Sequence, residues 1–256
     1  MPFIDAIINK SPSINAGSEE NEQIATSMAS SKYEALYSTV GISFWGGIDP
    51  LTGNVIDQSH PLHNQNISNK IVVIPSGRGS CTGSQVMLEL ILNKKAPRAI
   101  VLRDVDSILC TGAVIAEEFF ADEISGGDDV PIICAVGEEQ FAQLIDDGYD
   151  YLSIKTLDDE SSKGDVCIHS ENGEIYTKDL LKLRDTLESD AMQSDQTTSP
   201  AEELALHTVK RIASISGATE LIPITSAHID AVTYIGPGGL RFAQKLVELG
   251  GKVKVK

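Results

Sequence analysis

The sequence is short of positive charge, of cysteine and of long apolar runs. Its 256 residues include 20 Lys and Arg against 37 Asp and Glu, a formal net charge of −17. This acidity disfavours nucleic acids and anionic membranes as main partners, because phosphate groups bind best to basic surfaces. No apolar run reaches about 18 residues, the length that predicts a membrane-spanning helix. The N-terminus is acidic and has Lys10 as its only base before Lys32, so it resembles neither a signal nor a transit peptide.

The four cysteines, Cys81, Cys110, Cys134 and Cys167, are widely spaced. They form no Cys-x-x-Cys pair, so their spacing favours neither a zinc site nor a disulfide framework. Reduced thiols are typical of intracellular proteins, and we therefore expect a cytoplasmic protein.

Two histidines, His60 and His63, lie close enough in sequence to suggest a shared metal ion. Pro61 between them disfavours a helix that would align both rings. We therefore predict no metal site at this position.

A glycine- and serine-rich stretch over 75–84, Pro-Ser-Gly-Arg-Gly-Ser-Cys-Thr-Gly-Ser, follows an apolar run and precedes a predicted helix. A strand, a glycine-rich turn and a helix in this order expose backbone N–H groups and hydroxyls to a ligand. Arg78 adds a planar guanidinium that suits a carboxylate or a phosphate. An ordinary strand-to-helix turn is the alternative. The stretch is not a P-loop, because no Lys-Ser or Lys-Thr follows its final glycine.

The hydrophobic pattern predicts a mixed α/β domain in which strands first alternate with helices and then end in an antiparallel pair. Asn172-Gly173 is a strong hairpin signal between the last two strands. Asp104 and Asp106 could act as an acid–base pair, but N-capping of the second helix by Asp106 or Ser107 is the expected use. The expected strands are 34–40, 42–45, 71–74, 99–102, 131–136, 149–155, 164–169 and 175–177, and the expected helices are 85–93, 110–120 and 138–145.

A second unit begins after this domain. Residues 180–187 are amphipathic, and Ser199-Pro200-Ala201-Glu202 is a capping box that predicts a helix from Pro200 to about Ser216. A short strand over 220–224 and a helix over 240–249 are expected to follow.

We divide the chain into three parts: a poorly ordered extension over 1–31, a small domain over 32–177, and the start of a larger domain over 178–256. The last part stops where its second strand begins, so we expect that domain to be incomplete.

Several blocks of sequence resemble the aconitase X family. The block over 43–53, Ser-Phe-Trp-Gly-Gly-Ile-Asp-Pro-Leu-Thr-Gly, resembles its small-domain signature, as do Asp57 with His60-Pro61 and the block over 75–80. The block over 222–230 resembles the opening of the family's large catalytic domain. The resemblance implies a swivelling β/β/α small domain, fused here to the start of the large domain. It also implies a hydro-lyase that removes water from a small hydroxy acid such as cis-3-hydroxy-L-proline.

The resemblance also assigns roles to individual residues. Ser80 corresponds to the serine that accepts the substrate proton. Neighbouring N–H groups would have to stabilise its alkoxide, and the glycines of the stretch are expected to supply them. Arg78 and Gly79 are expected beside the substrate, with Arg78 close to its carboxylate. The expected substrate-contacting residues of the large domain are His228, Asp230, Ala231, Val232 and Thr233.

The sequence departs from the family pattern at Ala231, where glycine is expected, and at Cys81, where a small hydroxylic residue is common. The family implies an iron–sulfur cluster or iron, but its cysteine ligands are expected beyond residue 256. We therefore predict no metal ligands in this chain and no activity of the chain alone.

Two other functions fit parts of the pattern. The chain could be a non-catalytic swivel subunit that closes over a partner chain carrying the iron–sulfur domain. A nucleotide-binding module built on the glycine-rich stretch is disfavoured by the acidic composition and by the absence of a P-loop lysine.

Overall fold

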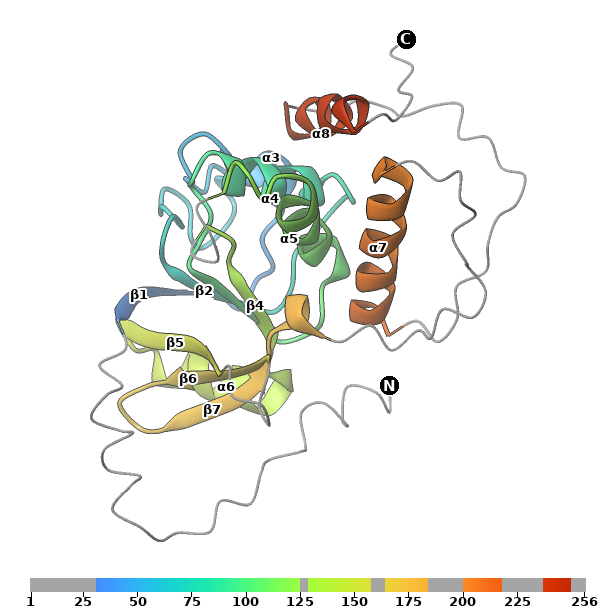
Figure 1. Cartoon of the computed structure of the whole chain (residues 1–256). Helices are drawn as coiled ribbons and strands as arrows, with labels where there is room; N and C mark the ends of the chain where they lie inside the picture. The colour runs from blue at the N-terminus through green and yellow to red at the C-terminus, as the bar shows by residue number, and fades with distance from the viewer. Residues whose placement is uncertain (1–30, 125–128, 158–163, 184–199, 218–236, 250–256) are drawn as a thin grey trace, which may run out of the picture.

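The computed structural model describes residues 31–124, 129–157, 164–183, 200–217 and 237–249 (Figure 1). Within these ranges, seven strands form one sheet in the order β4-β3-β2-β1-β5-β6-β7. The strands β1 to β4 pair in parallel, whereas β1, β5, β6 and β7 pair in an antiparallel arrangement. The strands are β1 (Lys32–Tyr37), β2 (Ile71–Ile74), β3 (Ala99–Leu102), β4 (Ile132–Ala135), β5 (Tyr151–Leu157), β6 (Asp165–His169) and β7 (Glu174–Lys178).

Helices cover both faces of the parallel half of the sheet. Val72 and Ile74 of β2 pack in the cluster that α4 and α5 complete, whereas Ile71 and Val73 pack in the cluster that includes Phe141 of α6. Burial on both faces explains why β2, β3 and β4 are almost wholly apolar. The helices are α3 (Phe44–Gly47), α4 (Gly83–Leu92), α5 (Ser107–Phe119), α6 (Gly137–Asp147), η2 (Leu180–Lys182), α7 (Pro200–Ile215) and α8 (Pro237–Glu248). None of these described helices is both long and apolar enough to cross a membrane.

The mixed α/β architecture expected from the sequence is confirmed, and so is the hairpin around Asn172-Gly173. The capping box over 199–202 is followed, as expected, by a helix that begins at Pro200. Of the amphipathic stretch over 180–187, the described part holds the short helix η2. Residues 1–30 of the expected extension and the strand expected over 220–224 lie outside the described residues.

The strand expected over 42–45 is wrong. Ile42 forms only an isolated bridge with Gly77, and the next residues form the single helical turn α3. This turn is interrupted at Trp45 and at Gly46, whose φ is 75°. Upstream, β1 ends at Tyr37 because the Ser38 hydroxyl bonds to the backbone of Val40 and so favours a local turn over a strand ladder.

The two ends of the sheet meet through Asp179. This residue forms a bridge with Cys134 of β4, and its N–H donates to Gly164 O at 2.8 Å. Its carboxylate accepts a hydrogen bond from the Leu181 N–H at 3.1 Å and so caps η2. Asp179 is only 4% exposed, and this burial raises its pKa to about 6.

The last two helices pack on the layer formed by α4 and α5, with α7 beside α5 and α8 over α4 (Figure 1). Arg211 of α7 pairs with Glu117 and Glu118 of α5. Phe242 of α8 meets Phe119 edge to face, with ring centroids 5.0 Å apart. The start of the second unit is therefore joined to the first by both ionic and aromatic contacts.

The buried carboxyl of Asp179 predicts a pH-dependent stability. Its pKa of about 6 in the folded chain lies above the ordinary value of 3.8, so the folded chain binds more protons than the unfolded chain at intermediate pH. The stability that the neutral acid contributes is present at low pH and is lost as the pH rises through 6.

Asp179→Asn keeps an acceptor for the Leu181 N–H but cannot ionise. From about pH 5 to about pH 8, we expect the native chain to lose roughly 1 kcal/mol of unfolding free energy relative to this variant. Urea titrations of both proteins across this range measure the difference. Parallel pH profiles would contradict the expectation.

Candidate active site

The loop between β2 and α4 forms one wall of a pocket at the carboxyl end of the parallel strands. Gly77 pairs with Ile42, and the Arg78 N–H donates to Ile42 O at 2.9 Å, so the loop is held against the segment that follows β1. Open α/β sheets place ligand sites at this end of their strands. The pocket is lined by Phe44, Gly77, Arg78, Gly79, Ser80, Gly83, Asp106, Ile108 and Leu109. The structure thus brings Arg78, Gly79 and Ser80 together at one pocket.

Ser80 is exposed, and its hydroxyl lies next to Thr82. The two hydroxyl oxygens are 2.8 Å apart, and the Thr82 N–H donates to the Ser80 hydroxyl oxygen at 3.1 Å. Donors of this kind are suited to stabilising negative charge on that oxygen. The backbone donor comes from Thr82, not from one of the glycines as the sequence suggested.

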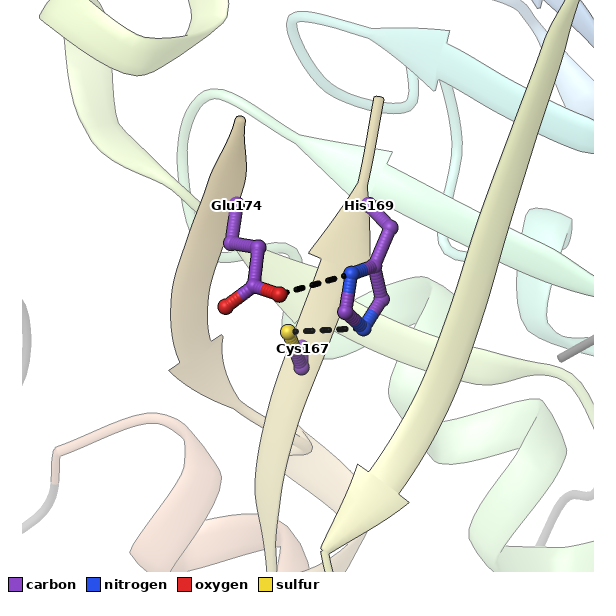
Figure 2. A group of neighbouring side chains, drawn as sticks. All are labelled: Cys167, His169 and Glu174. Carbon is purple, nitrogen blue, oxygen red and sulfur yellow. Dashed lines mark hydrogen bonds and ion pairs between the residues drawn. The ribbon is translucent and has the colours of Figure 1, made fainter. Parts of the chain in front are cut away.

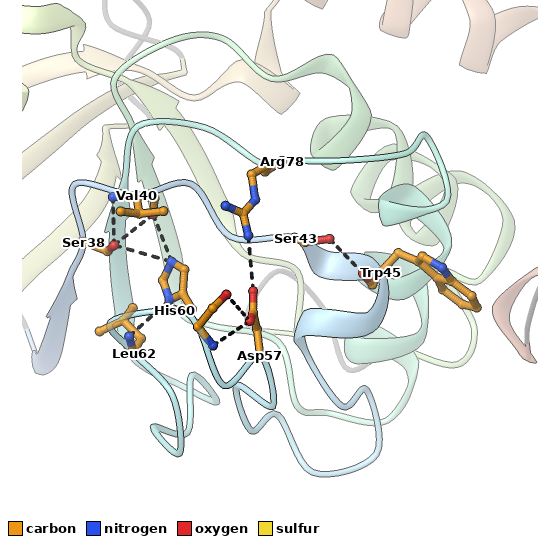
Figure 3. A network of polar contacts seen from close by, with 9 residues as sticks. Ser38, Val40, Ser43, Trp45, Asp57, His60, Leu62 and Arg78 are labelled. Carbon is orange, nitrogen blue, oxygen red and sulfur yellow. Dashed lines mark hydrogen bonds and ion pairs between the residues drawn. The ribbon is translucent and has the colours of Figure 1, made fainter.

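Arg78 carries the positive charge at the pocket and pairs with Asp57, their nearest nitrogen and oxygen being 3.2 Å apart (Figure 3). Asp57 is in turn held by Ser59, whose hydroxyl and N–H donate to the same carboxylate oxygen at 2.7 and 2.9 Å. These hydrogen bonds, and to a smaller extent the charge of Arg78, lower the pKa of Asp57. Arg78 is half exposed, so its guanidinium remains accessible to a ligand.

His60 has a structural role in this region. It is buried, its Nε2 lies 3.0 Å from Val40 O, and its Nδ1 accepts the Leu62 N–H at 3.1 Å (Figure 3). Because both ring nitrogens are used by the backbone, His60 fixes the loop and is not oriented to bind a metal.

Asp106 has a second role that the sequence analysis missed. As expected, it caps α5 by accepting the N–H groups of Ile108 and Leu109 at 2.9 and 3.1 Å. Its other oxygen accepts the Gly77 N–H at 2.7 Å and thereby fixes the pocket loop. A side chain at position 77 would place its Cβ 2.5 Å from this oxygen, so the Asp106 carboxylate would have to move out of this arrangement. No local sequence signal reveals this contact, because the two residues are 29 positions apart.

Gly79 adopts a φ of 104°, a conformation that other residues rarely take. It turns the chain between Arg78 and Ser80 and so presents both side chains at the pocket. The large-domain residues singled out from the sequence, His228, Asp230, Ala231, Val232 and Thr233, lie outside the described residues.

The described residues do not fit an iron–sulfur cluster, which needs several thiolates close together. Of the four cysteines, Cys81 is exposed at the pocket loop and the other three are buried. Burial raises the pKa of Cys110 and of Cys134, which opposes the thiolate form. Within the described ranges, the side chains close enough to hold a metal ion are Cys167, His169 and Glu174, which together offer a single thiol.

Comparison with known protein families identifies the family of this chain. Residues 23–161 match the aconitase X swivel domain, and residues 182–256 match the aconitase X first domain. The chain belongs to the aconitase X family. Both regions that resembled the family in sequence lie within these matches.

The aconitase X relatives are named as dehydratases. Cis-3-hydroxy-L-proline dehydratase of Pseudomonas aeruginosa is 40% identical over 222 residues, which cover 87% of this chain and 36% of the relative. The phosphomevalonate dehydratase small subunit of Methanothermobacter thermautotrophicus is 48% identical over 81 residues, which cover 32% of this chain and 62% of the relative. The chain thus spans about a third of the length of the first and under two thirds of the second.

A solved aconitase X from Thermococcus kodakaraensis, in its holo form, is 40% identical to the part that it matches. The match covers 35% of this chain and 68% of the solved chain, with a TM-score of 0.33.

The double role of Asp106 predicts a large effect of its removal. Asp106→Ala leaves two helix N–H groups and the Gly77 N–H without their acceptor, and we expect a loss of about 2 kcal/mol or more of unfolding free energy. Asp104→Ala is the matched control, because Asp104 is exposed and forms a surface ion pair with Arg103. Thermal unfolding of both variants measures the difference, and equal melting temperatures would contradict the assigned role.

Proposed function

We propose that this chain supplies the swivel domain and the opening of the catalytic domain of an aconitase X-type hydro-lyase. The observation that carries the proposal is the gathering of Arg78, Gly79 and Ser80 at one pocket in a chain related to named dehydratases. The proposed domains are the swivel domain over 32–177 and the start of the large domain over 178–256.

The proposed chemistry is the elimination of water from a hydroxy acid. Ser80, as an alkoxide, takes the proton from the carbon adjacent to the one that bears the hydroxyl. The electron pair of the broken C–H bond forms the carbon–carbon double bond as the C–O bond breaks and hydroxide leaves. The Thr82 N–H supports this role because it donates to the Ser80 oxygen. The Thr82 hydroxyl, 2.8 Å away, is placed to donate to the same oxygen when it is an alkoxide.

Arg78 is proposed to bind the substrate carboxylate. Its guanidinium is accessible and already pairs with the carboxylate of Asp57, the same chemical group that a hydroxy acid presents. In a protein with a net charge of −17, a fixed positive charge is needed to bind an anionic substrate.

The departing hydroxide is a poor leaving group and needs a proton donor or a Lewis acid. We propose that this group, the iron–sulfur cluster implied by the family, is held by residues that are not in this sequence. His228, Asp230, Ala231, Val232 and Thr233 are proposed to contact the substrate from the large-domain side.

The proposed substrate is a small hydroxy acid such as cis-3-hydroxy-L-proline, the compound in the name of the Pseudomonas aeruginosa relative. A second function is favoured by the relatives named as small subunits. In this alternative the chain is a non-catalytic swivel subunit that closes over a partner chain carrying the iron–sulfur domain. The four free cysteines support a cytoplasmic location in either case.

Replacement of Ser80 tests the proposed proton transfer. In an assembly that includes the complete catalytic domain, we expect Ser80→Ala to lower kcat about 100-fold or more, because the base is removed. Ser84→Ala is the control, since the Ser84 hydroxyl donates to Cys81 O in the first turn of α4 and has no assigned role in the reaction. Activity is measured with cis-3-hydroxy-L-proline. Equal loss in both variants would argue against a specific role of Ser80.

The dependence on residues outside this sequence can be tested directly. We expect no turnover when the 256-residue chain alone is incubated with iron, sulfide and cis-3-hydroxy-L-proline. Addition of the complete large domain should restore activity. Steady turnover by the chain alone would contradict the proposed division of the active site.

A further inference from the structure

The hairpin of β6 and β7 gathers three side chains that no step of the proposed reaction uses. Cys167 and His169 are two residues apart on β6 and therefore point to the same face of the sheet. Glu174 lies directly opposite His169 in the antiparallel register (Figure 2). A thiol, an imidazole and a carboxylate thus meet on one face of the hairpin, away from the pocket strand β2, which is separated from β6 by β1 and β5.

His169 is in contact with both of the other groups. The Cys167 sulfur lies 3.3 Å from Nε2 of His169, and Nδ1 of His169 lies 3.0 Å from a carboxylate oxygen of Glu174 (Figure 2). One ligand atom from each side chain can be chosen so that all three lie within 4.8 Å of one another. Zinc bonds of about 2.3 Å to sulfur and about 2.0 Å to nitrogen place neighbouring tetrahedral ligand atoms roughly 3.5 Å apart. The cluster is therefore close to the size of a metal site before any ion is bound.

The surroundings of the cluster leave one side open and hold the other in place. Cys167 is buried, whereas the His169 and Glu174 side chains are 24% and 44% exposed, which gives water access to a fourth position. The Tyr176 hydroxyl donates to the second carboxylate oxygen of Glu174. Such outer hydrogen bonds orient the ligands of metal sites. Lys155, opposite Cys167 on β5, is a positive charge close to the thiol.

A nucleophilic thiol is the alternative use of a Cys-His-Glu group, and the structure argues against it. Cys167 is only 2% exposed, so a substrate cannot reach its sulfur.

We propose that Cys167, His169 and Glu174 bind one divalent transition-metal ion of the zinc type, with water as the remaining ligand. The metal replaces the thiol proton, which is released to solvent, and joins β6 to β7. Because the site has one thiol, it is a mononuclear site and not an iron–sulfur site. It is independent of the hydro-lyase proposal, since it shares no residue with the pocket.

Cobalt(II) is the probe for this site, because coordination by a thiolate gives a strong sulfur-to-cobalt charge-transfer absorption. We expect the full 256-residue chain, reduced and freed of metal, to bind one equivalent of Co²⁺ with this absorption, and Zn²⁺ to abolish it. Cys167→Ser should remove the absorption. Cys81→Ser, which removes the exposed thiol instead, should retain it.

Two further variants separate metal binding from folding. His169 and Glu174 are partly exposed, so His169→Gln and Glu174→Gln leave the core of the sheet intact. We expect each to weaken Co²⁺ binding tenfold or more while the melting temperature of the metal-free protein changes little. The proposal is overturned if Co²⁺ binds without the sulfur absorption, if the absorption survives in Cys167→Ser, or if both Gln variants bind Co²⁺ as tightly as the native chain.

Discussion

The carboxylate of Asp106 is the point on which the geometry of the pocket depends. It accepts N–H groups from the loop after β2 and from the helix after β3, and thus joins the ends of two neighbouring parallel strands. Hydrogen bonds to an ionised acceptor are about twice as strong as neutral ones, and the N-terminus of a helix also favours negative charge. With Gly77 fixed in this way, the positions of Arg78 and Ser80 follow from the Ile42 contact and from the turn at Gly79.

A second constraint is electrostatic. The chain is strongly acidic, yet its pocket presents a guanidinium, and that guanidinium is held by a carboxylate. Ser59 fixes Asp57 and lowers its pKa, so the carboxylate stays ionised and holds Arg78 at the rim of the pocket. A substrate carboxylate would therefore exchange with Asp57 or share the guanidinium with it. The cost of ordering the arginine side chain is already met in the folded protein.

Much of the sheet could be predicted because its signals are local. The four-residue apolar runs of β2 and β3 end at polar turns, and Asn172-Gly173 fixes a hairpin. The segment over 42–45 was wrongly predicted as a strand because its apolar residues have the spacing of a strand. In the structure, Phe44 is buried and lines the pocket, and Trp45 is exposed to solvent. The loop containing Ser80 was identified from its glycines and hydroxyls, but the contacts that hold it were not.

The sequence could not reveal the contacts between residues that are brought together only by the pairing of strands. Asp106 reaches Gly77 because β2 and β3 are parallel neighbours, and His169 meets Glu174 because of the hairpin register. A search for Cys-x-x-Cys spacing passes over a cysteine whose partners are His169, two residues on, and a residue on the next strand.

The boundary between the two family matches does not coincide with a gap in the packing. The match to the first domain begins at residue 182, yet α7 and α8, which lie within it, pack on α5 and α4. Arg211 has a side chain only 16% exposed and two carboxylate partners, so separation of α7 from α5 would leave Glu117 and Glu118 without their cation. Separating such a partly buried pair is costly, because its charge-assisted hydrogen bonds are lost. These contacts join α7 and α8 to the swivel domain as one packed body.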